Sequence, residues 1–319
     1  MDTAEEKDCQ VKYLILGGGG FIGTHLCSAL LARGDAVRVL ERPRLKLDDA
    51  AAPPPKVDWR EGDFTNPTDV ADALDGCDRV FHLISTTLPK TSNDNPLYDL
   101  ESNVASTLRL LELIRNDNYP RKLVFLSSGG TVYGEPKATP IPEHHPTDPL
   151  CAYGVGKLAI EKYLELYHRL HGLDYVTLRL ANPYGEHQRS NAAQGAIAVF
   201  MQKALKDEAI EIWGDGGVVR DYIYIDDVVA AMLRAMDYSG AHRVLNIGSG
   251  VGTSLNDLHI ALQRLLGRPV KNRYLAARNF DAPINVLDIH LAQKELHWRP
   301  EVALIEGMGK LLRHMQETH

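Results

Sequence analysis

A run of glycines between an apolar stretch and an amphipathic stretch is the feature that most limits how this chain can fold. Residues 11–16 are apolar and β-forming, residues 17–23 read Gly-Gly-Gly-Gly-Phe-Ile-Gly, and leucines then recur at helical spacing. Gly17, Gly20 and Gly23 would let the backbone turn tightly and approach a pyrophosphate, which then lies at the helix N-terminus. The order of strand, glycine turn and helix therefore predicts a dinucleotide-binding unit.

The residues that end the next two predicted strands bear on which dinucleotide is bound. Residues 36–40 form a strand that ends at Glu41, whose carboxylate would accept hydrogen bonds from the adenosine ribose hydroxyls and repel a 2′-phosphate. This favours NAD over NADP, although Arg42 follows directly and could bind a 2′-phosphate. Asp63 ends the following strand, where it could meet the adenine amino group or cap the turn.

Strands alternate with helices through residue 185, which predicts a parallel sheet covered on both faces. Ligands bind at the carboxyl ends of the strands in such sheets. We expect one composite site there, because several glycine-rich or polar segments fall at predicted strand ends. These segments are 17–23, Glu41, Asp63, 127–131 and Asn182.

The predicted fold class is α/β, a Rossmann-type doubly wound parallel sheet with a smaller, mixed α/β C-terminal substrate lobe. The regular alternation of strands and helices changes after residue 185. We therefore assign residues 1–185 to the dinucleotide-binding domain, with 220–249 returning to it. Residues 186–219 and 250–319 are assigned to the substrate lobe.

Tyr153 and Lys157 open a long amphipathic segment whose apolar residues recur at helical spacing. Residues four apart on a helix share a face, so this phenol and this ammonium can point into one site. A neighbouring ammonium lowers the pKa of a phenol, which could then act as a general base. Tyr133 and Lys137 have the same spacing, but a glycine and a proline between them exclude a helix. Spacing alone also fits a surface helix, so the assignment depends on the surrounding motifs.

Composition argues against several kinds of partner. The chain has 319 residues and a net charge of −7, which disfavours a nucleic-acid or membrane-surface partner. No apolar run is long enough to span a membrane, and the N-terminus is acidic rather than signal-like. The four cysteines are scattered, so we expect a reduced, cytoplasmic protein without a metal site. His82 lies in a predicted buried strand and is expected to be a packed core histidine.

Further motifs follow the glycine turn in a fixed order. They are Ser-Ser-Gly-Gly-Thr-Val-Tyr-Gly from residue 127, Tyr-x-x-x-Lys from 153, Asn-Pro-Tyr-Gly from 182, and Gly-Asp-Gly-x-x-x-Arg-Asp-Tyr-Ile-Tyr-Ile-Asp-Asp from 214. With them the chain resembles the extended short-chain dehydrogenase/reductase superfamily and, within it, the nucleotide-sugar epimerases of the UDP-galactose 4-epimerase type. The resemblance covers nearly the whole chain and is more specific for the superfamily than for one reaction.

The resemblance implies a role for each matching residue. Tyr153 would take and return a sugar hydroxyl proton, and Lys157 would bind the nicotinamide ribose and keep the phenol acidic. Either Thr131 or Ser128 would hydrogen-bond the same sugar oxygen, and we favour Thr131. The implied cofactor is NAD, bound by Gly17, Gly20, Phe21, Ile22, Gly23, Glu41, Asp63, Asn103, Tyr153 and Lys157.

The implied substrate is a nucleotide sugar, most simply a UDP-sugar. Asn182 would contact its diphosphate, and Arg220 and Arg278 would clamp the pyrophosphate, a charge-assisted role that suits arginine. The position that lines the sugar pocket in this family holds Asn285, which is smaller than a tyrosine. An N-acetylated sugar or a uronic acid could therefore fit, and Arg189 could pair with such an acid or be a solvated surface residue.

Two further positions bear on the reaction. Gly129 stands where the family segment usually has a serine or threonine, so another residue must supply the hydroxyl. A dehydratase of this superfamily would carry an Asp-Glu pair at Gly130 and Thr131, and the absence of that pair argues against dehydration. It does not exclude a reductase or a decarboxylase.

The sequence therefore predicts an NAD-dependent epimerase acting at C4 of a UDP-hexose or a derivative of one. The alternatives are an NAD(P)-dependent nucleotide-sugar reductase or decarboxylase, and a non-catalytic NAD-binding regulatory protein. The resemblance also implies a homodimer formed through the helices near 100–116 and 153–170.

Overall fold

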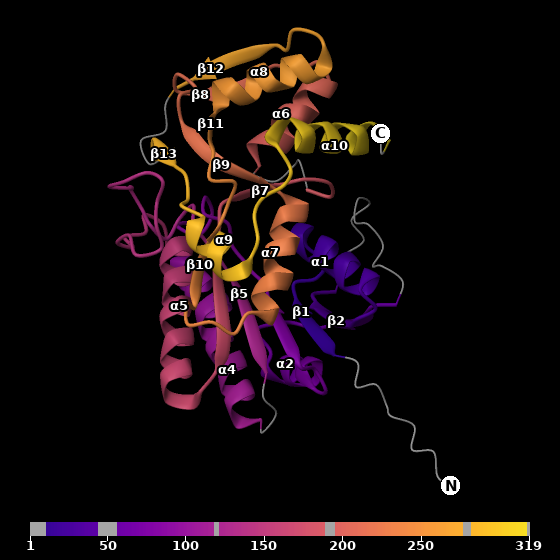
Figure 1. Ribbon diagram of the computed structural model, residues 1–319, viewed down its shortest axis with the longest axis vertical. Coiled ribbons are helices and arrows are strands. Elements are labelled where there is room, and N and C mark those ends of the chain that lie inside the picture. Colours follow the sequence, from indigo (N-terminus) through magenta and orange to yellow (C-terminus); the bar gives the residue numbers. More distant parts are fainter. Residues whose placement is uncertain (1–10, 44–55, 118–120, 189–194, 277–281, 318–319) are drawn as a thin grey trace.

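Seven parallel strands form the central sheet in the part of the chain that the computed structural model describes, which is residues 11–43, 56–117, 121–188, 195–276 and 282–317 (Figure 1). The strands are β1 (Lys12–Leu16), β2 (Ala36–Glu41), β3 (Asp58–Glu61), β4 (Arg79–His82), β5 (Lys122–Ser128), β6 (Asp174–Leu180) and β10 (Val244–Ile247). Their order is β10–β6–β5–β4–β1–β2–β3. The order reverses at β1, so the ligand crevice of such a sheet lies beyond the carboxyl ends of β1 and β4.

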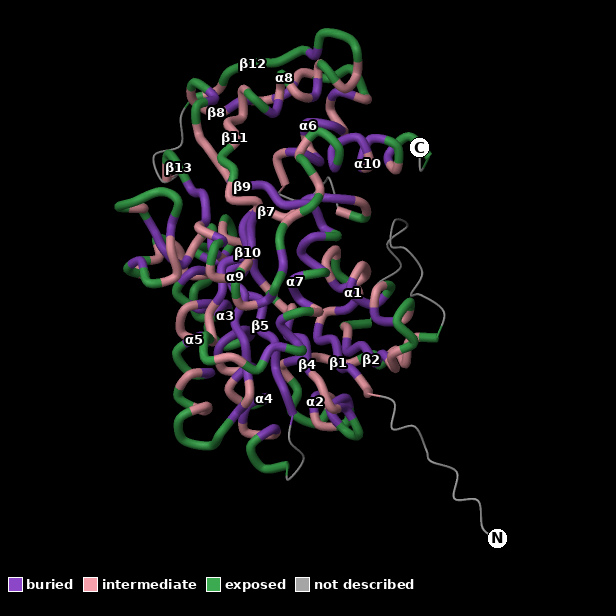
Figure 2. Tube along the Cα trace, viewed as in Figure 1, coloured by how far each residue is buried: buried purple, intermediate pink, exposed green. Residues whose placement is uncertain are grey.

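Side-chain alternation explains why both faces of the sheet are covered. In β1, Tyr13 and Ile15 pack into one buried cluster, whereas Leu14 and Leu16 pack into another. The first cluster includes residues of α1 (Phe21–Ala32) and α7 (Ile225–Asp237), and the second includes residues of α2 (Pro67–Leu74), α4 (Ser106–Asn116) and α5 (Ala152–His171). Figure 2 shows the buried strands enclosed by helices with exposed outer surfaces.

The helix expected near residues 100–116 is present but not uniform, and helical structure begins at Pro96. It consists of α3 (Pro96–Asp99), a π-helical segment η1 (Leu100–Ala105) and α4. A π-helical turn widens the helix locally and often marks a functional region. Asn103 lies inside this segment and is buried.

A smaller lobe lies at one end of the sheet (Figure 1). Its strands are β7 (Asn182–Tyr184), β8 (Ile210–Trp213), β9 (Val219–Tyr224), β11 (Gly252–Ser254), β12 (Asn272–Leu275) and β13 (Ile284–Asn285). Strand β9 pairs with β7, β11 and β13, and β8 pairs with β12. The helices after β7 are α6 (Ala196–Leu205), α7, α8 (Leu255–Leu266), α9 (His290–Leu296) and α10 (Leu304–Glu317).

The predicted fold class is confirmed, and one expected boundary needs correction. Residues 220–249 were expected to return as a block to the dinucleotide-binding domain. Only the later part does so, because β10 joins the large sheet and α7 packs on α1, whereas β9 belongs to the four-stranded sheet of the lobe. The reason is that β9 is the central strand to which β7, β11 and β13 pair, a non-local fact that no local pattern in 219–224 reveals.

A buried carboxylate joins the lobe to the large sheet. The side chain of Asp221 in β9 is fully buried and accepts hydrogen bonds from the backbone N–H groups of Ser249, Gly250 and Leu287 and from the Ser249 hydroxyl. Burial raises the pKa of this carboxyl group, and the hydrogen bonds act in the opposite direction. Asp221 therefore fixes the turn after β10 and the segment after β13 on one strand.

The glycine turn after β1 has no space for side chains at two positions. Gly17 has a φ of +88°, in the left-handed region. A Cβ on Gly23 would lie 2.5 Å from the carbonyl oxygen of Gly17, and a Cβ on Gly18 would lie 2.4 Å from a methyl carbon of Val39. Gly23 therefore lets α1 pack directly on the backbone of the turn, and Gly18 lets the turn pack directly on β2. A dinucleotide-binding turn requires such close packing.

His82 is a core residue, as expected. Its side chain is 1% exposed, and Nε2 lies 2.8 Å from the hydroxyl of Thr107. Burial lowers the pKa of the imidazole to about 3, and Lys157 acts in the same direction. In the described residues no helix has both the length and the apolar character needed to cross a membrane.

We expect Gly23→Ala to lower the free energy of unfolding by roughly 1–3 kcal/mol, because the new methyl group would overlap backbone atoms. Gly309→Ala in α10 is the control, since its Cβ would lie 3.7 Å from Leu265 in ordinary contact. Alanine in a helix interior is favoured over glycine by about 0.5–1 kcal/mol, so this variant should be stabilised. Urea denaturation measures both, and equal stability of the two variants would contradict this account of the turn.

Candidate functional site

Helix α5 brings the predicted tyrosine and lysine to the carboxyl end of β5. Lys157 is buried, and its Nζ donates a hydrogen bond to the carbonyl oxygen of Leu126 at 2.9 Å. The same nitrogen lies 4.8 Å from the ring centroid of Phe125 and 5.7 Å from that of Tyr153. The phenol and the ammonium therefore occupy one face of α5 against the strand end, as their spacing predicts.

The ionisation of this pair differs from the sequence-based expectation. Burial raises the pKa of the Tyr153 phenol to about 12, although a hydrogen bond with the Ser85 side chain acts in the opposite direction. Burial lowers the pKa of Lys157 to about 8, against the attraction of Asp99 and Glu161. The expected lowering of the phenol pKa is therefore wrong for the chain alone, because desolvation outweighs the lowering effect of the Ser85 side chain.

Thr131 has a side-chain hydroxyl that makes no hydrogen bond within the described residues. Its Oγ1 is buried. The backbone of Thr131 packs on the first turn of α5, because a Cβ on Gly154 would lie 2.8 Å from the Thr131 carbonyl oxygen. Ser128 ends β5 and is half-buried. The choice between the two hydroxyls stays a prediction, and the buried, unsatisfied hydroxyl of Thr131 supports this residue.

The missing side chain at Gly129 has a steric cause. A Cβ on Gly129 would lie 2.6 Å from a methyl carbon of Leu287. Asn285, two residues before Leu287, also contacts Gly129, because its Nδ2 donates a hydrogen bond to the Gly129 carbonyl oxygen at 3.2 Å. The lobe thus packs directly on the end of β5, and Leu287 fills the space that a serine or threonine would need.

The glycine turn and the acidic residue after β2 fit a dinucleotide. Gly20 is the N-cap of α1 and makes no side-chain cap, so the first N–H groups of the helix are available to an anion. Glu41 Oε2 accepts a hydrogen bond from Gly19 N at 3.0 Å, which holds the carboxylate beside the turn. Phe21 and Ile22 are half-buried in the first turn of α1. These residues would hold the pyrophosphate and the adenosine ribose.

The neighbouring basic residue has a partner within the chain. Arg42 Nε lies 3.6 Å from Asp63 Oδ2, and both side chains are half exposed, so the ion pair is weak. Asp63 Oδ1 accepts hydrogen bonds from the backbone and hydroxyl of Thr65. The turn-capping role considered for Asp63 is therefore present, and its contact with adenine stays a prediction.

Asn103 braces the loop that follows β4. Its Oδ1 accepts a hydrogen bond from Thr86 N at 3.0 Å, and its Nδ2 donates to the carbonyl oxygen and carboxylate of Asp99. Through these contacts Asn103 holds the loop after β4 against Asp99. Its predicted contact with the cofactor is not tested by them.

The predicted substrate residues meet at the junction of lobe and sheet. Asn182 Nδ2 donates to the backbone oxygen of Asp221 at 2.9 Å, and Arg220 Nη1 donates to the backbone oxygen of Ala282 at 2.7 Å. Asn285 pairs in register with Arg220, and its Oδ1 is buried without a partner among the described residues. Arg278 and Arg189 lie outside the described residues.

Three residues that contact Tyr153 or its helix were not predicted from the sequence. Ser85, Ser92 and Asn93 lie in the loop after β4 and contact the start of α5. Ser92 and Asn93 are separated from their partners by 61 and 59 residues. Only the topology of the sheet, which sets β4 beside β5, could have indicated such contacts.

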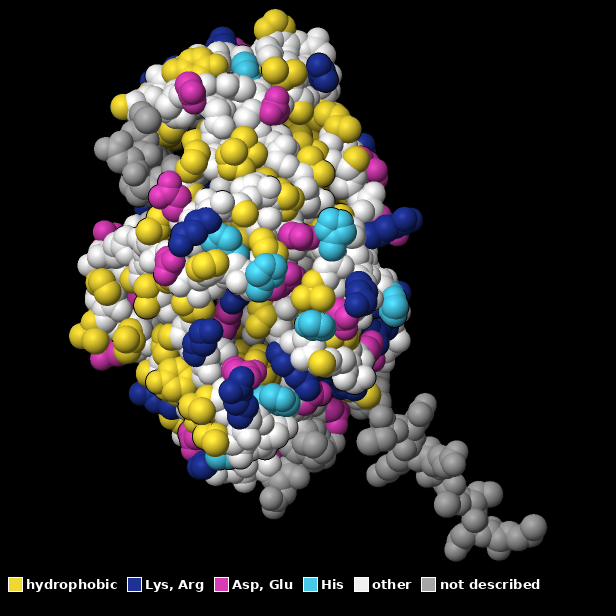
Figure 3. Space-filling model, turned by 60° about the vertical axis from the view of Figure 1, so that its left-hand side comes forward, with side chains coloured by type: hydrophobic (Ala, Val, Ile, Leu, Met, Phe, Trp, Pro, Cys, Tyr) yellow, Lys and Arg dark blue, Asp and Glu magenta, His cyan; other side chains and the backbone are white. Residues whose placement is uncertain are grey.

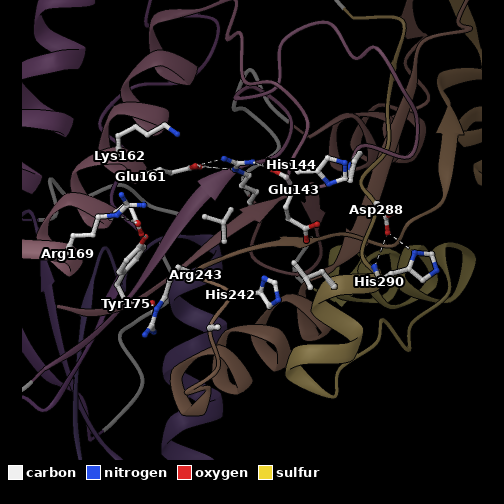
Figure 4. Close-up of a pocket in the computed structure, with 16 residues that line it drawn as sticks. Glu143, His144, Glu161, Lys162, Arg169, Tyr175, His242, Arg243, Asp288 and His290 are labelled. Atoms are coloured by element: carbon white, nitrogen blue, oxygen red, sulfur yellow. Dashed lines mark hydrogen bonds and ion pairs between the residues drawn. The ribbon is translucent and has the colours of Figure 1, made fainter. Parts of the chain in front are cut away.

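A cavity of about 740 Å³ lies against a later part of α5, residues 161–169, and none of the predicted site residues lines it (Figure 4). A buried ion pair lies at its base, where Arg179 Nη2 donates to Glu161 Oε2 at 2.7 Å. Glu161 also accepts a 2.5 Å hydrogen bond from the Ser127 hydroxyl. It follows Lys157 by one helical turn, so this pair fixes the face of α5 that carries the tyrosine and the lysine.

We expect Glu161→Gln to lower the free energy of unfolding by roughly 3 kcal/mol, because it leaves the buried Arg179 guanidinium without a counter-charge. Glu165→Gln on the same helix is the matched control, since its charged partner Arg169 is largely exposed and the amide oxygen can still accept the hydrogen bond from the Tyr175 hydroxyl. That change should cost about 1 kcal/mol or less. Chemical denaturation compares the two, and similar losses would show that the Glu161 pair does not anchor the helix.

Comparisons with known proteins agree with this geometry. Residues 13–248 match the model of the NAD dependent epimerase/dehydratase family. The chain is 36% identical over 305 residues to the UDP-glucose 4-epimerase of Mycolicibacterium smegmatis, covering 94% of this chain and 97% of the relative. It is 32% identical over 321 residues to a dTDP-4-dehydro-6-deoxyglucose reductase of Escherichia coli, covering 95% of this chain and 97% of that one.

A solved structure is similar over almost the whole length. The crystal structure of UDP-glucose 4-epimerase with UDP-glucose from Thermotoga maritima has a TM-score of 0.91 and 33% identity to this chain, covering 97% of it and 99% of the solved chain. The similarity includes the lobe as well as the sheet.

Proposed function

Because the chain belongs to the NAD dependent epimerase/dehydratase family, we propose that it is an NAD-dependent 4-epimerase of a UDP-hexose or a derivative of one. The observation that carries the proposal is the placement of Tyr153 and Lys157 on one face of α5 at the end of β5, with a buried, unpartnered Thr131 hydroxyl in the segment that packs on the first turn of α5. The glycine turn at the end of β1 lies at the same edge of the sheet, where a dinucleotide would reach them.

In the proposed reaction, residues of this chain would take one proton from the sugar and later return it. The phenolate of Tyr153 accepts the proton of the C4 hydroxyl as the sugar is oxidised to a ketone, and returns it when the ketone is reduced from its other face. NAD supplies the hydride acceptor and donor of these two half-reactions. Thr131 would hydrogen-bond the same sugar oxygen, and Lys157 would hold the nicotinamide ribose. The net redox change is zero.

Because the pKa of Tyr153 is high, the cofactor would also have to favour the ionised form of this phenol. A phenol with a pKa of about 12 is almost entirely protonated at neutral pH. Positive charge beside a phenol favours the phenolate, and the oxidised nicotinamide ring carries such a charge. We therefore propose that Tyr153 becomes an effective base only in the loaded enzyme.

The substrate contacts are proposed from the junction of lobe and sheet. Asn182 and Arg220, with Arg278 beyond the described residues, would bind the diphosphate. Asn285 supports a pocket open to larger sugars, because its side chain is short, buried and drawn toward the Gly129 carbonyl oxygen. An N-acetylated sugar or a uronic acid therefore stands beside an unsubstituted hexose as a candidate, and Asn285 Oδ1 could accept a hydrogen bond from the N–H of an N-acetyl group.

A reductase is the second candidate, favoured by the 32% identity to a nucleotide-sugar reductase over nearly the same length. The two reactions differ in stoichiometry. An epimerase regenerates NAD in every cycle, whereas a reductase or an oxidative decarboxylase changes the cofactor once per product. A non-catalytic NAD-binding protein would turn over none of these sugars.

We expect the purified protein with NAD to convert UDP-glucose, UDP-N-acetylglucosamine or UDP-glucuronate into a product of unchanged mass and inverted C4, without accumulation of NADH. Tyr153→Phe should lower kcat by roughly 10²-fold or more, the scale of general-base catalysis, while NAD still binds. Tyr163→Phe, an exposed phenol on the same helix, is the control. Mass spectrometry, proton NMR and absorbance at 340 nm measure these outcomes, and stoichiometric NADH would favour the rival.

We propose a homodimer through α5 and the segment from α3 to α4. The support is a set of exposed apolar side chains on this side: Leu97 at 65%, Leu100 at 53%, Tyr163 at 38%, Leu166 at 43% and Leu170 at 64% exposure. Figure 3 turns this side toward the reader and shows hydrophobic side chains gathered at the lower left of the molecule. Large exposed apolar patches of this kind are typical of protein interfaces.

Leu166→Lys combined with Leu170→Lys should convert the dimer into a monomer in sedimentation velocity, because two charges would be buried in the apolar interface. Ile260→Lys combined with Tyr274→Lys is the control, since these residues are exposed on the lobe. If the variant with Leu166→Lys and Leu170→Lys is still a dimer, this interface is wrong.

We also propose a cytoplasmic location. Its support is that Cys27, Cys77 and Cys151 are all free thiols, and that burial raises the pKa of the first two.

A further inference from the structure

Helix α5 begins without a cap of its own. Its N-cap residue, Cys151, makes no side-chain hydrogen bond to the first turn. The first N–H groups of a helix have no partner within the helix and must be satisfied from elsewhere. Tyr153 occupies the second position of this helix, so whatever satisfies these groups also fixes the backbone of the proposed base.

The loop after β4 supplies the missing cap. Asn93 Oδ1 accepts a hydrogen bond from Ala152 N at 2.9 Å, and Ser92 Oγ accepts one from Tyr153 N at 3.0 Å. Ser92 is fully buried, and its hydroxyl donates to the carbonyl oxygen of Pro89 at 3.2 Å. The hydroxyl thus has one donor partner and one acceptor partner, which leaves it a single orientation.

The same loop also reaches the phenol. Ser85 Oγ donates a hydrogen bond to the carbonyl oxygen of Thr87 at 3.0 Å, and the Ser85 side chain lies close enough to the Tyr153 phenol to lower its pKa. While the phenol is protonated, Ser85 can donate to Thr87 and accept from the phenol. Once the phenol has lost its proton, rotation of the Ser85 hydroxyl lets it donate to the phenolate.

The shape of the loop is held by groups on α3 and η1. Thr86 N donates to Asn103 Oδ1 at 3.0 Å, and the Thr87 hydroxyl donates to Asp99. Asp99 also lies against α5, because a Cβ on Gly156 would be 3.0 Å from Asp99 Oδ2. The loop, the π-helical segment and the start of α5 therefore form one braced unit.

We propose that Ser85, Ser92 and Asn93 are positioning residues for Tyr153, with Ser92 and Asn93 fixing its backbone and Ser85 directing its phenol oxygen. This inference rests on the proposed function, in which Tyr153 is the base. The loop then acts on the reaction through Tyr153 alone and needs no contact with the substrate. The ionisable groups that face the phenol besides Lys157 are Asp99 and Cys151.

The first test separates positioning from folding. Ser92→Ala should lower kcat by roughly tenfold with little change in KM or NAD affinity, since small displacements of a reacting group cost up to about 10²-fold. Ser254→Ala is the matched control, because it removes an equivalent cap from α8 in the lobe. An unchanged kcat in Ser92→Ala, or an equal loss in both variants, would overturn the proposal.

The second test addresses the phenol. Ser85→Ala should shift the acidic, ascending limb of the kcat/KM profile to higher pH, because the phenolate loses a hydrogen-bond donor and the pKa of the base rises. Ser85→Thr, which keeps the hydroxyl, should restore the original profile. A profile that does not move in Ser85→Ala would remove Ser85 from the proposal.

A third readout does not depend on activity. In Ser92→Ala, amide hydrogen exchange should become faster at Ala152 and Tyr153, the groups that the loop caps, and should stay unchanged there in Ser254→Ala. If the wild-type protein epimerises no sugar while this pattern holds, the proposed function fails and the cap stands. If exchange at Tyr153 is unchanged, the cap fails whatever the activity.

Discussion

The seating of α5 on β5 is the interaction on which the rest of the site depends. Tyr153, Lys157 and Glu161 follow one another at single-turn intervals, so they lie on one face of the helix. Lys157 is held by the Leu126 carbonyl oxygen, and Glu161 by the buried guanidinium of Arg179. Burying an ammonium is unfavourable, as the lowered pKa of Lys157 records, and nearby carboxylates offset part of that penalty.

The lobe completes this arrangement by packing on the same strand end. Asp221 ties β9 to the turns after β10 and β13, and Asn285 then reaches the carbonyl oxygen of Gly129. Leu287 occupies the space beside Gly129, so there is no room for a side chain at that position. Thr131 keeps a buried hydroxyl without a partner two residues further on, which is consistent with the proposed change of hydroxyl donor.

Local signals predicted the sheet and most of the candidate site, because the features involved are encoded by neighbouring residues. The glycine turn, the residues at strand ends and the spacing of Tyr153 and Lys157 are of this kind. The pKa of Tyr153 was predicted with the wrong sign, since desolvation depends on everything that surrounds the ring. The membership of β9 in the lobe and the cap from Ser92 depend on segments far apart in sequence, which no local pattern reports.

The ionisation of Tyr153 with and without bound NAD tests the central claim most directly. Tyrosine labelled with ¹³C at Cζ reports phenol ionisation by NMR, and Tyr153→Phe assigns the resonance. Without NAD we predict a titration near the pKa of about 12 that burial imposes. With NAD bound we predict a pKa lower by roughly 1–3, the size of the effect that a nearby opposite charge has on an acidic group in proteins. A pKa that stays unchanged when NAD binds would contradict the proposed role of Tyr153 as the base of the loaded enzyme.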